Sequence, residues 1–124
     1  MWRISVLLLL GSVVQGSILT SAQLSAVGPL LSKRGPTIIA FSAKWCTACE
    51  VLHEDLNREL SRRPDVTLRI IDVERDPIAS KFSITALPDV LVFDANGSFL
   101  GEIVGADVIG ILQKLGKSKK VLSL

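Results

Sequence analysis

The sequence predicts a single α/β domain in which helices flank a mixed four-stranded β-sheet. A strand–helix–strand pattern runs over residues 37–73, and such a unit within one sheet forms a right-handed parallel crossover. Two further apolar runs enclose the turn Ala-Asn-Gly at residues 95–97, which indicates an antiparallel hairpin because Asn-Gly tolerates positive φ. An amphipathic helix pattern follows over residues 107–115. From this order of elements, we expect a mixed sheet with helices on both faces.

The first half of the domain alternates helix and strand. Residues 23–33 have a weak helical pattern, which a Gly-Pro pair interrupts. Residues 37–43 form a short, continuous apolar run with β-branched residues at its start, which is typical of a buried strand. A helical pattern then covers residues 46–62, and residues 66–73 predict the second strand.

The second half predicts a short helix, a strand hairpin and a closing helix. Residues 77–83 form the short helix, which opens with Pro77, a position where the missing N–H of proline is tolerated. Strands are expected over residues 89–94 and 98–104. Asp107 is a suitable N-cap for the last helix, because its carboxylate can accept the free N–H groups of the first turn.

Residues 1–22 have the layout of a secretory signal peptide. One positive charge, Arg3, precedes a short apolar run, and small residues follow. The run is shorter than the about 20 apolar residues that span a bilayer. We expect cleavage after Gly16 or Ala22, and we assign residues 23–124 to the mature domain. An uncleaved N-terminal anchor is the alternative.

Composition and the leader together restrict location and partners. The 124 residues are 48% hydrophobic and carry a formal net charge of +2, which suits one domain with an ordinary core. Acidic and basic residues are interspersed, so we expect no nucleic-acid partner. The leader predicts export, to a bacterial periplasm first and otherwise to a secretory lumen or the extracellular space, where disulfides persist. We expect a monomer.

The two cysteines stand at the start of the helix predicted over residues 46–62. Free N–H groups and the helix dipole favour negative charge in a first turn, and the thiolate is the reactive form of cysteine. Cys49 falls within the apolar stripe of this helix and Cys46 at its edge. We therefore expect Cys46 to be an accessible nucleophile and Cys49 a covered, resolving thiol. Lys44 would support the thiolate and Glu50 would oppose it.

Three motifs carry a resemblance to a known family. The segment AKWCTAC, between a buried strand and a long helix, resembles the thioredoxin family. In ITALPDVLVF, Pro88 matches the family's cis-proline and Leu87 precedes it; in GEIVGAD, Gly105 matches a family glycine near the site. The resemblance extends from Pro36 to Leu115 and implies a thioredoxin-like fold. It leaves open whether a short N-terminal strand is added to the sheet.

The resemblance implies thiol–disulfide exchange with protein substrates through a redox-active Cys46–Cys49 disulfide. Cys46 would attack a substrate disulfide and Cys49 would resolve the mixed disulfide. No cofactor and no metal are implied beyond the two thiols, and another thiol protein would act as electron donor or acceptor. The residues that would bind the substrate are Trp45, Leu87, Pro88 and Gly105.

Several positions depart from the family pattern. Thr47-Ala48 replaces the familiar Gly-Pro between the cysteines, a form similar to bacterial periplasmic thiol-reducing domains. Ala40 stands where many members have a buried acid that assists proton transfer at the resolving thiol, and Glu54 replaces a common helix proline. Because the residues between the cysteines carry no charge, we expect a mid-range or reducing couple.

Three alternatives remain open from the residues alone. The chain could be a peptide-binding or chaperone-like module of the same fold without redox turnover. It could handle a metal through Cys46, Cys49 and His53, the only histidine, although structural zinc sites usually have four ligands. The cysteines could also form a purely structural disulfide, which gains little because the loop is so short. We interpret His53 as a helix-surface residue rather than a proton shuttle or ligand.

Overall fold

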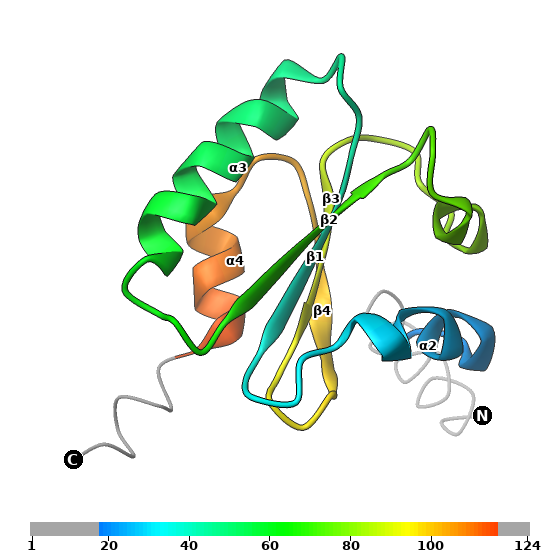
Figure 1. Ribbon diagram of the computed structural model, residues 1–124. Coiled ribbons are helices and arrows are strands. Elements are labelled where there is room, and N and C mark those ends of the chain that lie inside the picture. Colours follow the sequence, from blue (N-terminus) through cyan, green and yellow to red (C-terminus); the bar gives the residue numbers. More distant parts are fainter. Residues whose placement is uncertain (1–17, 117–124) are drawn as a thin grey trace, which may run out of the picture.

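The computed structural model of the chain describes residues 18–116 and has a mixed four-stranded sheet at its centre (Figure 1). The strands, in the spatial order β2-β1-β3-β4, are β1 Thr37–Ser42, β2 Thr67–Asp72, β3 Asp89–Phe93 and β4 Phe99–Val104. Strand β1 pairs with β2 in parallel and with β3 in antiparallel, and β3 pairs with β4 in antiparallel. This is the predicted sheet, and no strand precedes β1 within the described residues.

Helices cover both faces of the sheet. Helices α3 (Thr47–Leu60) and α4 (Val108–Leu115) lie on one face, and α2 (Ser21–Val27) with the 3₁₀ helix η2 (Pro77–Lys81) lies on the other (Figure 1). A 3₁₀ turn, η1 (Gly28–Leu30), continues α2. No helix within residues 18–116 is long and apolar enough to cross a membrane.

Strand β1 is buried along its whole length because it lies between two neighbours and under helices on both faces. Successive side chains of a strand point to opposite faces. Accordingly, Ile38 and Ala40 belong to the core under α3 and α4, whereas Ile39 and Phe41 belong to the core under α2. The continuous apolar run in the sequence therefore reflects a strand with two buried faces.

Local signals set the element boundaries. The Asp107 carboxylate accepts the Gly110 N–H at 2.9 Å and caps α4, as predicted. Gly97 has φ +84°, a turn conformation that glycine adopts without strain. Helix α2 begins earlier than predicted, at Ser21, because Thr20 and Gln23 form a reciprocal capping box. The domain boundary predicted at residue 23 therefore falls inside this helix, and residues 1–17 of the predicted signal peptide lie outside the described residues.

Candidate functional site

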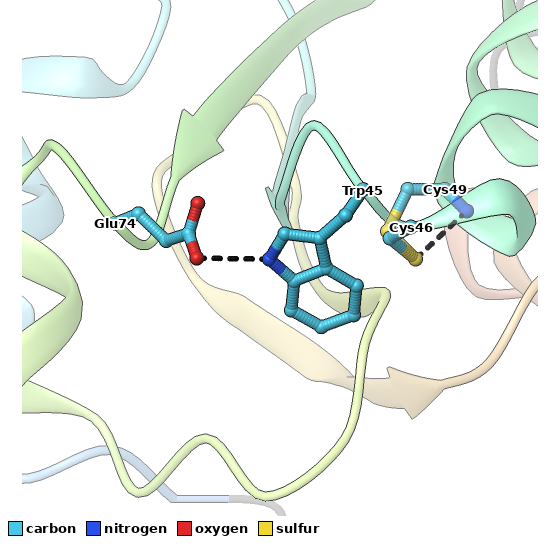
Figure 2. The surroundings of a disulfide bond; sticks show 4 residues. All are labelled: Trp45, Cys46, Cys49 and Glu74. Carbon is cyan, nitrogen blue, oxygen red and sulfur yellow. Dashed lines mark hydrogen bonds between the residues drawn. A yellow bond between two sulfur atoms is a disulfide. The ribbon is translucent and has the colours of Figure 1, made fainter.

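Both cysteines lie where β1 leads into α3. Cys46 is the N-cap of α3 and Cys49 is in its first turn, and the two form a disulfide with Cα atoms 5.3 Å apart. The Cys49 N–H donates to the Cys46 sulfur at 3.1 Å (Figure 2). The same N–H also donates to the Cys46 carbonyl at 3.1 Å, so the Cys46 sulfur lies at a helix terminus, where negative charge is favoured. The predicted Cys46–Cys49 bond at a helix start is confirmed.

The cysteines differ in exposure less than the sequence predicts. Cys49 is fully buried, as expected, but Cys46 is also largely covered, with 7% of its surface exposed. Ala43, Val73 and Leu87 pack against the pair. Because these residues come from three separate loops, helical periodicity could not reveal the cover over Cys46. The expectation of an openly accessible Cys46 is wrong for this oxidised form.

Leu87, Pro88 and Gly105 meet at the same end of the sheet as the cysteines. The peptide bond between Leu87 and Pro88 is cis, and Leu87 packs against the cysteine pair. The Pro88 carbonyl accepts the Gly105 N–H at 2.8 Å, which joins the loop before β3 to the loop after β4. Gly105 has φ +108°, a conformation that other residues rarely adopt. The structure thus brings these three predicted site residues together.

Trp45 lies on the surface beside the disulfide. Its side chain is exposed, and Nε1 donates to Glu74 Oε2 at 2.8 Å (Figure 2). Trp45 was expected to bind the substrate, and its side chain lies on the surface, where a bound chain can reach it. Glu74 was missed because it follows β2, far along the chain; the parallel pairing of β1 and β2 brings their carboxyl ends together.

A cavity of about 550 Å³ opens between the tryptophan, the end of β2 and the loop before β3. Trp45 and Glu74 form one side and Leu87 another, so the cavity is adjacent to the redox pair. Pro77, Phe82 and Ile84 add apolar lining. The shape suits a side chain of a bound polypeptide, since binding pockets combine apolar walls with a few polar groups.

A buried acid follows the proline loop, and no role was predicted for it from the sequence. Asp89 is the first residue of β3, only 2% exposed, and its Oδ1 has no hydrogen-bond partner. The pKa of Asp89 is raised to about 8. Burial is the largest cause, and the side-chain hydrogen bond with Glu102 and the negative charge of Glu102 add to it. An alternating strand pattern could have placed Asp89 on an inward face, but only the pairing of β3 with β4 identifies its partner.

A second polar cavity of about 340 Å³ lies beside α3, and His53 contributes to its wall. His53 is only partly exposed, its Nε2 is buried without a partner, and burial lowers its pKa. His53 thus lies at the edge of the helix surface, consistent with the prediction, but its Nε2 is covered by the protein. Within residues 18–116, no three His, Cys, Asp or Glu side chains are grouped so that they could hold a metal ion.

Comparison with known proteins agrees with this geometry. The family model described as Thioredoxin matches residues 24–116. The chain belongs to the thioredoxin family. Its fold is thioredoxin-like, as predicted, and its Cys46–Cys49 disulfide is the CxxC pair of a thioredoxin-family thiol–disulfide oxidoreductase.

Similar thioredoxins come from several organisms. Thioredoxin-3, mitochondrial, of Saccharomyces cerevisiae is 30% identical over 92 residues, which cover 73% of this chain and 72% of that protein. A solved structure of mitochondrial thioredoxin 3 from this yeast, in the oxidised form, has a TM-score of 0.63 at 27% identity, covering 74% of this chain and 87% of that one. Thioredoxin O1, mitochondrial, of Arabidopsis thaliana is 38% identical over 76 residues, which cover 59% of this chain but only 39% of that protein.

Proposed function

We propose that this thioredoxin-family protein exchanges disulfides with protein substrates outside the cytoplasm, using its WCTAC segment as the redox centre. The observation that carries the proposal is the asymmetry of the two sulfurs. The Cys46 sulfur caps α3 and receives the Cys49 N–H, whereas Cys49 is fully buried behind it. A thiolate at Cys46 is stabilised by this donor and by the helix terminus, so Cys46 is the attacking group.

The reaction moves two electrons from the dithiol to the substrate. The Cys46 thiolate attacks one sulfur of the substrate disulfide, a Cys46–substrate bond forms, and the other substrate sulfur leaves as a thiolate. Cys49, deprotonated, then attacks the Cys46 sulfur. The Cys46–Cys49 disulfide forms, the second substrate sulfur leaves as a thiolate, and both substrate thiolates take up protons. The reverse sequence would oxidise a substrate dithiol.

The substrate chain docks around the disulfide on Trp45, Leu87, Pro88 and Gly105. Trp45 offers an exposed aromatic face that its bond to Glu74 holds in place. The hydrogen bond from the Gly105 N–H to the Pro88 carbonyl fixes the two loops on the opposite side of the docking surface. The cavity beside Trp45 accepts a substrate side chain. A second thiol protein regenerates the starting state, because the chain's own two thiols supply only one two-electron exchange.

The N-terminal segment directs export in this proposal, and cleavage after Gly16 suits the fold better than cleavage after Ala22. Cleavage after Ala22 would remove the capping residue Thr20 and the first two residues of α2. The loss of such a cap typically lowers stability by about 1 kcal/mol. N-terminal sequencing of protein recovered from the periplasm or culture medium tests both export and cleavage after Gly16. Recovery of the full-length protein from the cytoplasm or from mitochondria would contradict them.

A disulfide-reduction assay with a protein substrate tests the function. Cys46→Ser should abolish turnover, whereas Cys49→Ser should accumulate a mixed disulfide that mass spectrometry detects after acid quenching. Substrate binding without any turnover by the wild-type protein would instead favour a peptide-binding module. Equilibration with glutathione at known ratios then separates a reductant from an oxidant, and we expect the mid-range or reducing side.

A further inference from the structure

We propose that His53 accepts the proton of the Cys49 thiol when Cys49 attacks the mixed disulfide, through water in the cavity beside α3. This inference rests on the proposed thiol–disulfide exchange and assigns the proton path within it. From the sequence, His53 was expected on the helix surface, without a role in proton transfer.

Cys49 needs a proton acceptor because of its surroundings. It is fully buried, and the apolar side chains of Ala43, Val73 and Leu87 pack against the cysteine pair. Burial among apolar groups disfavours a thiolate. Beneath α3, Ala40 is also fully buried and contributes only a methyl group. The proton of Cys49 must therefore leave toward a polar group beyond this apolar shell.

His53 is placed to receive that proton. It follows Cys49 by four residues in α3, a spacing that brings Cβ atoms to about 5–6 Å on one helix face. Helical side chains also lean toward the N-terminus, which directs the imidazole toward the turn that holds Cys49. Its Nε2 is buried and has no hydrogen-bond partner. A buried, unpaired polar nitrogen is unusual in a folded protein and calls for a role or a bound water.

The cavity provides the connection. His53 and Ala43 both line it, and Ala43 also packs against the two cysteines, so the cavity extends to the apolar wall of the redox pair. Its volume of about 340 Å³ accommodates several water molecules. The remaining lining residues are Ser42, Lys44, Glu50, Ile70 and Asp72. Lys44 and Glu50 are exposed, so the cavity also reaches solvent.

The charges around His53 leave it able to accept a proton at neutral pH. Burial lowers its pKa, and Glu50 opposes this effect, so the imidazole is neutral in the resting protein. The other charged groups facing the cavity are Lys44 and Asp72, and Asp72 lies 3.8 Å from Arg75. In the resolving step the Cys49 proton passes to His53 and forms an imidazolium. The imidazolium then releases this proton to solvent through the cavity. In the reverse reaction, His53 donates a proton to Cys49.

Asp89 is the other buried titratable group near the disulfide, and it faces away from α3. Val90 belongs to the core under α3, and side chains alternate along a strand, so Asp89 points with Leu91 and Phe93 to the face that α2 covers. Its partner Glu102 lies on that face as well, because Glu102 pairs with Leu91. On the α3 side of the disulfide, the titratable atom that is buried without a partner is therefore Nε2 of the partly exposed His53.

The test is a rapid-quench measurement of the resolving step across pH 5.5–9. Reduced wild-type protein, His53→Gln and His53→Ala are mixed with oxidised glutathione, and the mixed disulfide is quantified by mass spectrometry. A positioned base contributes about 10²–10⁴-fold, so we expect resolution at pH 7 to slow at least about tenfold in both variants. Their rates should keep rising to high pH, whereas the wild-type rate should level off. Added imidazole should restore part of the rate in His53→Ala.

Controls separate a proton-transfer role from a structural one. Glu54→Gln changes the exposed neighbouring residue and should keep wild-type rates. Alkylation of Cys46 by iodoacetamide should not change in any variant, since the first thiol is not involved. Wild-type pH profiles for both His53 variants would overturn the inference and leave the proposed function standing. A wild-type protein that never resolves a mixed disulfide would overturn the proposed function itself.

Discussion

The buried acid Asp89 should make the stability of the protein fall as pH rises. Asp89 is 2% exposed, and its pKa rises from the ordinary 3.8 to about 8 in the folded state. The unfolded chain loses this proton near pH 4, whereas the folded protein keeps it until about pH 8. The contribution of neutral Asp89 to stability is therefore complete below pH 4 and is lost progressively as pH rises through 8.

The size of the effect follows from the two pKa values. Their difference corresponds to a ceiling of about 6 kcal/mol, at about 1.36 kcal/mol per pH unit. Because Glu102 is exposed, water reaches one side of the pair once both carboxyls are charged. We therefore expect a measured loss of about 2–4 kcal/mol between pH 5 and 9. This is a large fraction of the about 5–15 kcal/mol that stabilises a typical domain.

Asp89→Asn removes the titration but keeps a donor for Glu102. We expect the variant to match the wild-type protein within about 1 kcal/mol at pH 5 and to exceed it by about 2–3 kcal/mol at pH 9. Guanidinium unfolding of the oxidised proteins at five pH values measures this difference. Asp94→Asn, at the hairpin turn, is a control outside the acid pair and should keep the wild-type slope with pH. If the stability of the wild-type protein and of Asp89→Asn changed equally with pH, Asp89 could not be the group responsible for the loss.

Three further substitutions test the core and the docking surface. Leu56→Ala opens a cavity at a fully buried position of α3 and should lower the free energy of unfolding by about 2–5 kcal/mol, measured by guanidinium unfolding; a loss below 1 kcal/mol would contradict the packing. Gly105→Ala places a side chain at φ +108° and should lower the free energy of unfolding by about 1–3 kcal/mol. The KM for a protein substrate should rise, because the Gly105 N–H donates to the Pro88 carbonyl. An unchanged KM would show that this hydrogen bond is not needed for substrate docking. Glu74→Ala releases the Trp45 indole and should change tryptophan fluorescence and raise KM, with the rate of Cys46 alkylation as the unaffected control.

The positions of the elements and of the redox centre could be predicted from the sequence. Continuous or amphipathic apolar patterns identified the four strands and the long helices, and Asp107 and the Asn-Gly turn marked boundaries that the structure keeps. These features depend on neighbours within a few residues, so the local pattern contains them. The cysteine pair at the start of α3 was equally readable, because a helix terminus and a spacing of three residues suffice to define it.

The surroundings of that centre could not be predicted from the sequence, because they depend on how distant segments pack together. Trp45 and Glu74 are 29 residues apart in sequence, and they meet because β1 and β2 lie side by side in parallel. The cover over Cys46, the pairing of Asp89 with Glu102 and the cavity beside His53 likewise bring together residues from separate segments. Periodicity assigns a residue to a face of its own helix or strand. The partner it meets there depends on the order of strands in the sheet and on how the loops pack at the sheet's end.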